Sequence, residues 1–243
     1  MSTGKEGNKD IILHPTDSER NCDIHTLSAV NTKLDGIDDM YYVLTGSYAI
    51  EALTQQRFRH GDIDSNIFTK DIFEAKRRAV KIFEGLVLSE GILEPYREAE
   101  SSLWYMLKPN DRHLTPKRLE LQFVEYRLTQ DSPAVFSLEG PEDKFFRVPT
   151  TIVSLKDSDN RSFDFRVKSL SYLIASWALR ISGMAEDQKR AVVASDLDNL
   201  GYLLRVGYEY NEVIEAIRSH PQMPKNSSEA LIFKNALAAV FGK

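Results

Sequence analysis

The hydrophobic positions follow two different periods along the first two thirds of the chain. Apolar side chains at 24, 27, 30 and 34 recur at helical spacing and predict a helix over residues 24–34. Compact or alternating apolar runs predict strands over residues 41–44, 62–68, 103–108, 118–127, 150–155 and 162–167. Helical spacing returns between the first strands and predicts helices over residues 48–55 and 71–84.

After the last predicted strand the pattern is helical only. It predicts helices over residues 170–181, 188–206, 212–218 and 228–241. The polar, glycine-containing residues 1–20 are typical of a flexible N-terminal arm. We therefore expect an α+β fold in which a mixed sheet with flanking helices spans residues 21–168. A C-terminal helical bundle is expected over residues 169–243.

Composition narrows the functional classes. The 243 residues are 42% hydrophobic and 28% charged, with a net charge of −5, so there is no overall attraction to nucleic acid. Cys22 is the only cysteine, which excludes an internal disulfide and is typical of a reducing compartment. No apolar run approaches ~20 residues and the N-terminus is polar, so we expect a cytoplasmic protein without membrane contact.

One segment carries recognisable chemistry. Gly46 permits a sharp turn after the strand 41–44, and Ser47 stands where the next helix needs its N-cap. The N–H groups of a helix N-terminus favour a phosphate. Asp62 and Asp64 then point to the same face of the following strand, since side chains alternate along a strand. Paired carboxylates beside a phosphate are typical ligands of Mg²⁺.

The same residues carry a resemblance. Thr45-Gly46-Ser47 followed by Asp62-Ile63-Asp64 resembles the signature of the polymerase-β-like nucleotidyltransferase superfamily. Residues 44–51 and 61–64 are similar to two branches, the lincosamide and aminoglycoside nucleotidyltransferases and the AbiEii-type toxins. The resemblance implies a nucleotidyltransferase-type sheet with a third carboxylate on a later strand. Glu120 matches that place best, although the family often has Asp there, and Glu125 is the second choice.

The activity implied by the resemblance is Mg²⁺-dependent transfer of an NMP from an NTP to an acceptor hydroxyl. Asp62, Asp64 and Glu120 would hold one or two Mg²⁺ ions, and Glu120 could also take the proton of the acceptor hydroxyl. Gly46 and Ser47 would hold the outer phosphates.

Basic residues supply further candidates for phosphate contacts: Arg59, Arg180 and Lys189. Residues 148–167 and the helical stretch with Arg180 and Lys189 also look like the toxin branch. That branch usually has a lysine in the helix before the arginine, where this chain has Ser176 and Trp177. The ordinary alternative for each of these cations is a solvated surface position.

The sequence leaves the acceptor open among an antibiotic-like small molecule, a tRNA and a protein. An alternative function is a nucleotide-binding or interaction module with weak or no catalysis, favoured by the departures in the C-terminal half. A third is the toxin half of a toxin–antitoxin pair, which would have an antitoxin partner.

Overall fold

The computed structural model describes residues 16–35, 37, 39–57, 60–84, 86–89, 91–130, 135–139, 145–187, 194–224 and 226–242. The helices are α1 Asp17–Leu34, α2 Gly46–Thr54, α3 Ile72–Phe83, α4 Leu170–Asp187, α5 Ala194–Arg205, α6 Tyr210–Arg218 and α7 Glu229–Phe241. The strands are β1 Tyr41–Leu44, β2 Ile63–Thr69, β3 Gly91–Ala99, β4 Ser102–Pro109, β5 Lys117–Glu125, β6 Leu128–Gln130, β7 Val135–Glu139, β8 Phe145–Lys156 and β9 Ser162–Lys168.

The strands form one mixed sheet in the order β3-β4-β5-β2-β1-β9-β8-β7-β6. Its centre combines both pairings, because β1 is antiparallel to β2 and parallel to β9, while β2 is parallel to β5. The outer neighbours pair antiparallel. The central strands β1, β2 and β5 therefore carry the segments in which the sequence places its candidate chemistry.

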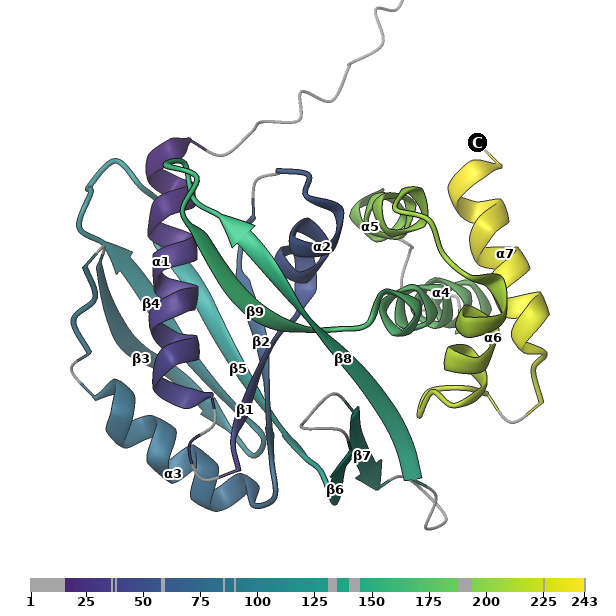
Figure 1. Ribbon diagram of the computed structural model, residues 1–243, viewed down its shortest axis with the longest axis horizontal. Helices are drawn as coiled ribbons and strands as arrows, with labels where there is room; N and C mark the ends of the chain where they lie inside the picture. The colour runs from purple at the N-terminus through teal and green to yellow at the C-terminus, as the bar shows by residue number, and fades with distance from the viewer. Residues whose placement is uncertain are drawn as a thin grey trace, which may run out of the picture.

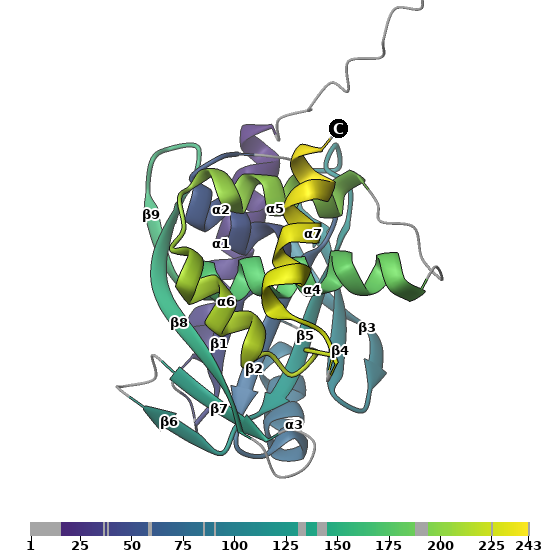
Figure 2. The same ribbon diagram turned by 90° about the vertical axis from the view of Figure 1, so that its right-hand side faces the viewer.

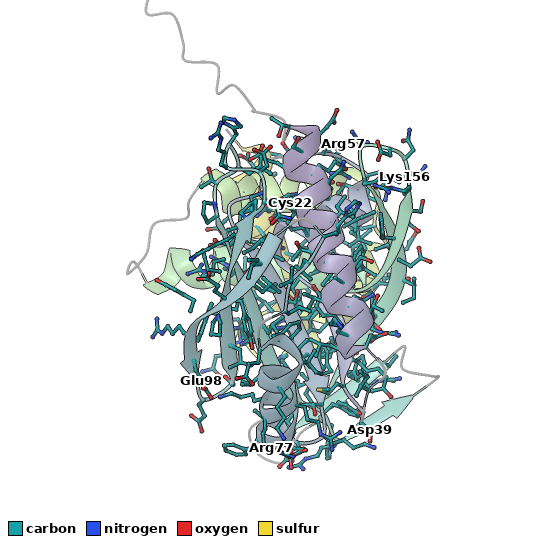
Figure 3. The ribbon with its side chains drawn as sticks, turned by 90° about the vertical axis from the view of Figure 1, so that its left-hand side faces the viewer. Cys22, Asp39, Arg57, Arg77, Glu98 and Lys156 are labelled. Atoms are coloured by element: carbon teal, nitrogen blue, oxygen red, sulfur yellow. The ribbon has the colours of Figure 1, made fainter. Side chains whose placement is uncertain are left out.

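Helices cover the two sides of this sheet unequally (Figure 1). Helices α1 and α3 lie on one side, where Figure 3 shows α1, which carries the buried Cys22, running along the sheet. Helices α4 to α7 gather on the other side as the C-terminal bundle (Figure 2). Helix α2 follows β1 and packs between the sheet and α5. The fold thus leaves a space between the sheet and the bundle at the end of β1.

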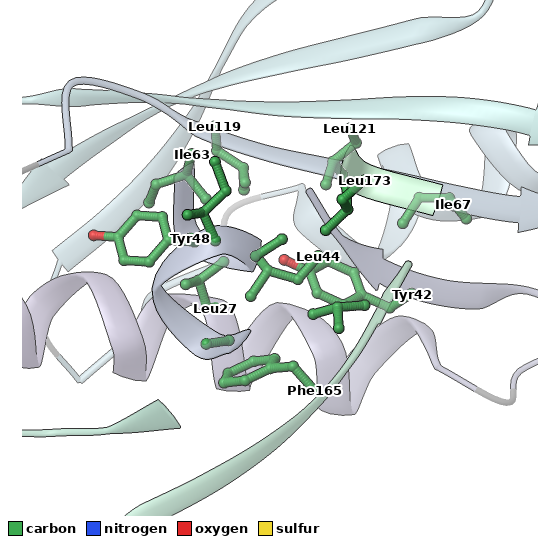
Figure 4. Close-up of a cluster of buried hydrophobic side chains, with 14 of the residues drawn as sticks. Leu27, Tyr42, Leu44, Tyr48, Ile63, Ile67, Leu119, Leu121, Phe165 and Leu173 are labelled. Atoms are coloured by element: carbon green, nitrogen blue, oxygen red, sulfur yellow. The ribbon is translucent and has the colours of Figure 1, made fainter. Parts of the chain in front are cut away.

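The core is built by the alternating apolar residues of the central strands (Figure 4). Ile63 and Ile67 of β2 and Leu119 and Leu121 of β5 are fully buried and share one face of the sheet. Polar residues at the intervening positions therefore share the opposite face. This alternation positions the site described below.

The α+β class, with a mixed sheet followed by a helical bundle, is confirmed, but several boundaries differ from prediction. Helix α1 begins at Asp17 instead of residue 24, because Thr16 and Glu19 form a reciprocal capping box. Residues 17–20 are therefore helical and Arg20 is buried, which corrects the expected arm of residues 1–20. Residues 1–15 lie outside the described residues.

Three strands were not predicted. β3 carries many exposed polar side chains, so its apolar alternation is weak. β6 and β7 fall in a stretch that we expected to be a loop. Within the described part of the chain, none of the helices combines the length and the apolar character needed to cross a membrane.

Candidate functional site

The turn after β1 depends on a glycine. Gly46 has a φ of 60°, in the left-handed region that side chains disfavour. A Cβ atom at this position would lie 2.6 Å from Asp64 Oδ2. The Thr45 N–H also donates to the Asp64 carbonyl oxygen at 3.1 Å. The turn is therefore held directly against the Asp64 carboxylate.

Two of the predicted carboxylates lie side by side. β2 and β5 are parallel, and their register places Asp64 beside Glu120. Asp62 lies just before β2, where its Oδ2 accepts a hydrogen bond from Arg118 Nη2 at 2.6 Å. The structure therefore groups the three carboxylates Asp62, Asp64 and Glu120 at one end of the β2–β5 pair.

Glu125 occupies a different place. It pairs in register with Thr69 at the far end of β2 and forms an ion pair with Arg127 at 2.8 Å. The position of Glu120 beside Asp64 makes Glu120 the better candidate for the third carboxylate.

The electrostatics of Asp64 reflect a concentration of negative charge. Burial raises the pKa of the Asp64 carboxyl, and the nearby Glu120 and Asp62 carboxylates raise it further. The Arg118 guanidinium acts in the opposite direction. An additional cation at this point would relieve the repulsion between these carboxylates.

The residues present fit Mg²⁺, which takes oxygen ligands and usually keeps some positions for water and substrate phosphates. Asp64 and Glu120 supply carboxylates in register, and Gly46 leaves room above Asp64. Among the described residues, no three His, Cys, Asp or Glu side chains converge closely enough to enclose a metal ion by themselves. Asp62 is instead engaged by Arg118. The geometry fits a cation whose coordination the substrate completes.

Asp64 and the Gly46 turn line a cleft of about 910 Å³ between the sheet and the helical bundle. Its sheet wall contains Thr45, Gly46 and Asp64, together with Asn66 and Gln122, whose side chains hydrogen-bond at 3.0 Å. The opposite wall comes from β9, α4 and the segment after α6, with the lining residues Lys168, Tyr172, Leu173, Ser176, Trp177, Leu179, Arg180, Gly183, His220, Pro221 and Gln222.

Two cations line the helical wall. The Lys168 ammonium lies 5.7 Å from the centre of the Tyr172 ring, and burial lowers the pKa of Lys168 to about 8. The Arg180 guanidinium lies over the Trp177 ring at 5.0 Å and forms an ion pair with Asp196 at 3.3 Å. The Asp64 carboxylate thus lines the same cleft as these two cations, an arrangement suited to a polyphosphate bound with a cation.

The remaining predicted phosphate contacts divide into two groups. Arg180 lines the cleft, and its contact with a phosphate stays a prediction. Arg59 and Lys189 lie outside the described residues, so their role stays a prediction.

Ser47 does not cap α2. Thr45 is the N-cap residue, and Ser47 lies within the first turn of the helix. The Ser47 hydroxyl instead hydrogen-bonds to His60 Nδ1 at 2.7 Å. His60 Nε2 in turn bonds to the Glu51 carboxylate at 2.6 Å, and Glu51 also pairs with Arg20 of α1. The predicted N-cap role of Ser47 is therefore wrong, because the helix begins at Gly46, two residues earlier than predicted.

Sequence reasoning missed Lys168 in the cleft and the hydrogen bonds of His60 to Ser47 and Glu51. Lys168 enters the cleft because β9 runs parallel beside β1, and no local pattern predicts which strands become neighbours. His60 stands nine residues after Glu51 and thirteen after Ser47, spacings that match no helical or strand period. The position of His60 just before Asp62-Ile63-Asp64 was the one available signal.

Comparisons with known proteins add one structural similarity. No family model matches the sequence, and no curated protein matches it significantly. Among solved structures, MenT4, the nucleotidyltransferase toxin Rv2826c from Mycobacterium tuberculosis H37Rv, superposes with a TM-score of 0.44 and 11% sequence identity. The superposition covers 93% of this chain and 95% of the MenT4 chain. At this level the similarity does not indicate an activity.

Proposed function

We propose that the cleft binds a nucleoside triphosphate with Mg²⁺ and transfers its nucleotidyl group to an acceptor hydroxyl. The observation that carries this proposal is the pairing of Glu120 with Asp64, which lies directly beside the Gly46 turn and lines the same cleft as Lys168 and Arg180. Such a cleft can hold a cation on one wall and phosphate oxygens on the other.

Each wall has a distinct role in this reaction. Asp64 and Glu120, together with Asp62 once it leaves Arg118, would hold Mg²⁺, which supplies charge neutralisation at the reacting phosphate. The N–H groups in the first turn of α2 would donate to phosphate oxygens, and the Lys168 ammonium and Arg180 guanidinium, which line the same cleft, would bind them as cations. Positioning and charge neutralisation account for most of the rate in such transfers.

The acceptor hydroxyl loses its proton when it attacks, so a base is needed near the reacting phosphate. Glu120 is placed beside Asp64 and is partly exposed, so it can take that proton as the acceptor oxygen attacks. A small molecule, a tRNA and a protein stay the three candidate acceptors. A toxic activity and an antitoxin partner likewise stay predictions from the sequence resemblance.

One observation favours a second candidate function, a nucleotide-binding module without catalysis. The Asp62–Arg118 ion pair engages a carboxylate that a full set of metal ligands would need. If this pair persists with nucleotide bound, the cleft would bind phosphates but transfer nothing.

Single-residue variants separate these functions. The purified protein is incubated with Mg²⁺ and each of the four NTPs labelled at the α-phosphate, and binding and label transfer to RNA, protein and aminoglycoside or lincosamide acceptors are measured. We expect Asp64→Asn and Glu120→Gln each to lower transfer by at least about 100-fold, because each removes charge stabilisation at the phosphate. Glu125→Gln is the matched control and should retain transfer.

The outcome decides between the two functions. Metal-dependent binding without transfer to any acceptor would favour the binding module. NTP binding that is unchanged in Asp64→Asn and in the absence of Mg²⁺ would contradict the proposed site altogether.

A further inference from the structure

Ser47, His60 and Glu51 form a continuous hydrogen-bonded chain. Ser47 Oγ lies 2.7 Å from His60 Nδ1, and His60 Nε2 lies 2.6 Å from Glu51 Oε2. His60 is only 4% exposed and Glu51 only 1% exposed, whereas Ser47 is partly exposed at the start of α2. A hydroxyl, an imidazole and a buried carboxylate in this order are the parts of an activated serine.

The positions of the protons follow from the Glu51 carboxylate. Burial alone would raise the pKa of Glu51, but hydrogen bonds from His60 and Arg20 outweigh burial and hold that pKa below its usual value. Glu51 is therefore ionised and can only accept, so His60 Nε2 carries the proton of that hydrogen bond. In a neutral His60 ring, Nδ1 is then the acceptor and takes the hydrogen bond of the Ser47 hydroxyl.

Buried side chains hold the His60 ring in place. Glu51 pairs with Arg20 of α1, and Asp23 of α1 pairs with Lys117 of β5. Tyr48, which stacks on His60 with ring centres 3.6 Å apart, donates its hydroxyl to Asp23. The orientation of the imidazole between Ser47 and Glu51 is therefore fixed by packing as well as by its own hydrogen bonds.

A second serine–histidine pair in the cleft shows the opposite arrangement. Ser176 Oγ lies 3.0 Å from His220 Nε2, but His220 Nδ1 accepts the N–H of Gln222 at 3.2 Å. His220 Nε2 therefore carries the proton and donates to Ser176, whose own proton goes to the Tyr172 carbonyl oxygen at 2.9 Å. His220 cannot accept a proton from Ser176 in this arrangement. Ser176 thus serves as an internal control for Ser47.

We propose that Ser47 is an activated nucleophile and that it is itself an acceptor of the nucleotidyl group. This inference rests on the proposed function for the nucleotide, but its serine chemistry is independent of it. In the step, a bond forms between Ser47 Oγ and the α-phosphorus while the bond from that phosphorus to the bridging oxygen of pyrophosphate breaks. The hydroxyl proton passes to His60 Nδ1, and pyrophosphate leaves.

The first test uses a phosphorus electrophile that needs no nucleotide site. The full chain is treated with a fluorophosphonate probe, and labelled peptides are identified by mass spectrometry. We expect the label on Ser47 and not on Ser176 in the same sample. His60→Gln and Glu51→Gln should lower the labelling rate, by about 100-fold for His60→Gln, since a general base contributes at least that factor.

Folding of the variants is checked by circular dichroism, and Ser47→Ala, which removes only a partly exposed hydroxyl, must abolish the label. An unlabelled Ser47 in the wild-type protein, or equal labelling of Ser47 and Ser176, would overturn the inference. Both results are read in the wild-type chain, so they do not depend on whether the His60 variant folds.

The second test uses nucleotide. The wild-type protein is incubated with Mg²⁺ and α-phosphate-labelled ATP, GTP, CTP or UTP, and denatured protein is analysed for a covalent nucleotidyl group. An adduct on Ser47 supports the inference, whereas bound nucleotide with no adduct, a phosphoryl adduct, or an adduct elsewhere overturns self-modification. A protein that binds no nucleotide but reacts with the fluorophosphonate would instead disprove the proposed function and leave the activated serine standing.

Discussion

At the scale of single residues, Gly46 links backbone conformation to the placement of charge. Its left-handed φ and its missing side chain allow the turn to approach the Asp64 carboxylate. Any side chain at this position would require both a disfavoured backbone conformation and a displaced carboxylate. Gly46 thus determines both where α2 begins and how closely the backbone approaches the Asp64 carboxylate.

We expect Gly46→Ala to abolish Mg²⁺-dependent NTP binding while the protein stays folded. The cost in unfolding free energy should be about 1–2 kcal/mol, the strain of a left-handed alanine. Gly61→Ala is the control, because a Cβ atom there meets nothing within 4 Å. Isothermal titration calorimetry and thermal unfolding measure both effects, and normal binding by Gly46→Ala would contradict the assigned contact with Asp64.

Lys168 makes anion binding sensitive to pH. Burial lowers the pKa of its ammonium to about 8, so the free protein loses this positive charge as the pH rises through that value. A bound polyphosphate favours the charged form. We expect the affinity for Mg²⁺-tripolyphosphate to fall as pH rises from 7 to 9.

Two variants of Lys168 check that prediction. Lys168→Met should weaken binding at pH 7 by about tenfold or more, the usual effect of losing a charged hydrogen bond. It should also remove the loss of affinity between pH 7 and 9. Lys168→Arg should keep binding across that range, because a guanidinium stays charged. An unchanged pH profile in Lys168→Met would show that another group is responsible.

At the scale of elements, the local signals in the sequence identify most of the structure. The run at residues 41–44 corresponds to β1, because an uninterrupted apolar run is typical of a strand buried on both faces. The helix at residues 71–84 corresponds to α3, where apolar side chains recur on one face. The Thr16 capping box shows why α1 was predicted too short. The first turn of α1 is stabilised by the two hydrogen bonds of the capping box, so its sequence needs no apolar residues at helical spacing.

Residue patterns alone predicted the site only where its residues are close in the sequence, and Glu120 and Arg180 came from the family resemblance. Gly46 lies in the turn after β1, and Asp62 and Asp64 stand two residues apart where β2 begins. Alternation along the strand alone therefore places the two carboxylates on the same face. Lys168 and His60 depend on strand order and on a loop path, which are set by tertiary packing. Their roles therefore needed the three-dimensional structure.

The cap of α1 gives a prediction for stability without an effect on the cleft. Thr16→Ala removes the hydroxyl that accepts the Glu19 N–H at 3.2 Å and should lower the unfolding free energy by about 1 kcal/mol. Thr32→Ala on the same helix removes only an exposed bond to the Ser28 carbonyl oxygen and should change stability by less than about 0.5 kcal/mol. Urea denaturation distinguishes the two, and equal stabilities would mean that the cap contributes nothing.

At the scale of the whole molecule, His220 makes the packing of the helical bundle sensitive to acid. Burial and the neighbouring Lys168 ammonium lower the pKa of His220 from 6.5 to about 4. The unfolded chain therefore binds a proton at a higher pH than the folded chain. The stabilisation from a neutral His220 is complete above pH 6.5 and is lost as the pH falls toward 4.

We expect the unfolding free energy to fall by on the order of 3 kcal/mol between pH 6.5 and 4 through this group. Urea denaturation across this range is compared between the wild-type protein and His220→Gln, which keeps a donor for Ser176 but does not titrate. The variant should lose that part of the acid sensitivity. Parallel stability curves for the two proteins would contradict the assignment.

A single residue, Ser169, separates the end of β9 at Lys168 from the start of α4 at Leu170. The Ser169 N–H donates a hydrogen bond to the Pro149 carbonyl oxygen at 2.8 Å, and the Ser169 carbonyl oxygen accepts one from the Leu173 N–H. So short a connection fixes the N-terminal end of α4 relative to β9 and its neighbour β1. Any widening of the cleft must therefore take place toward the C-terminal end of α4. The end of the cleft at Lys168 stays fixed, and a substrate is aligned against it.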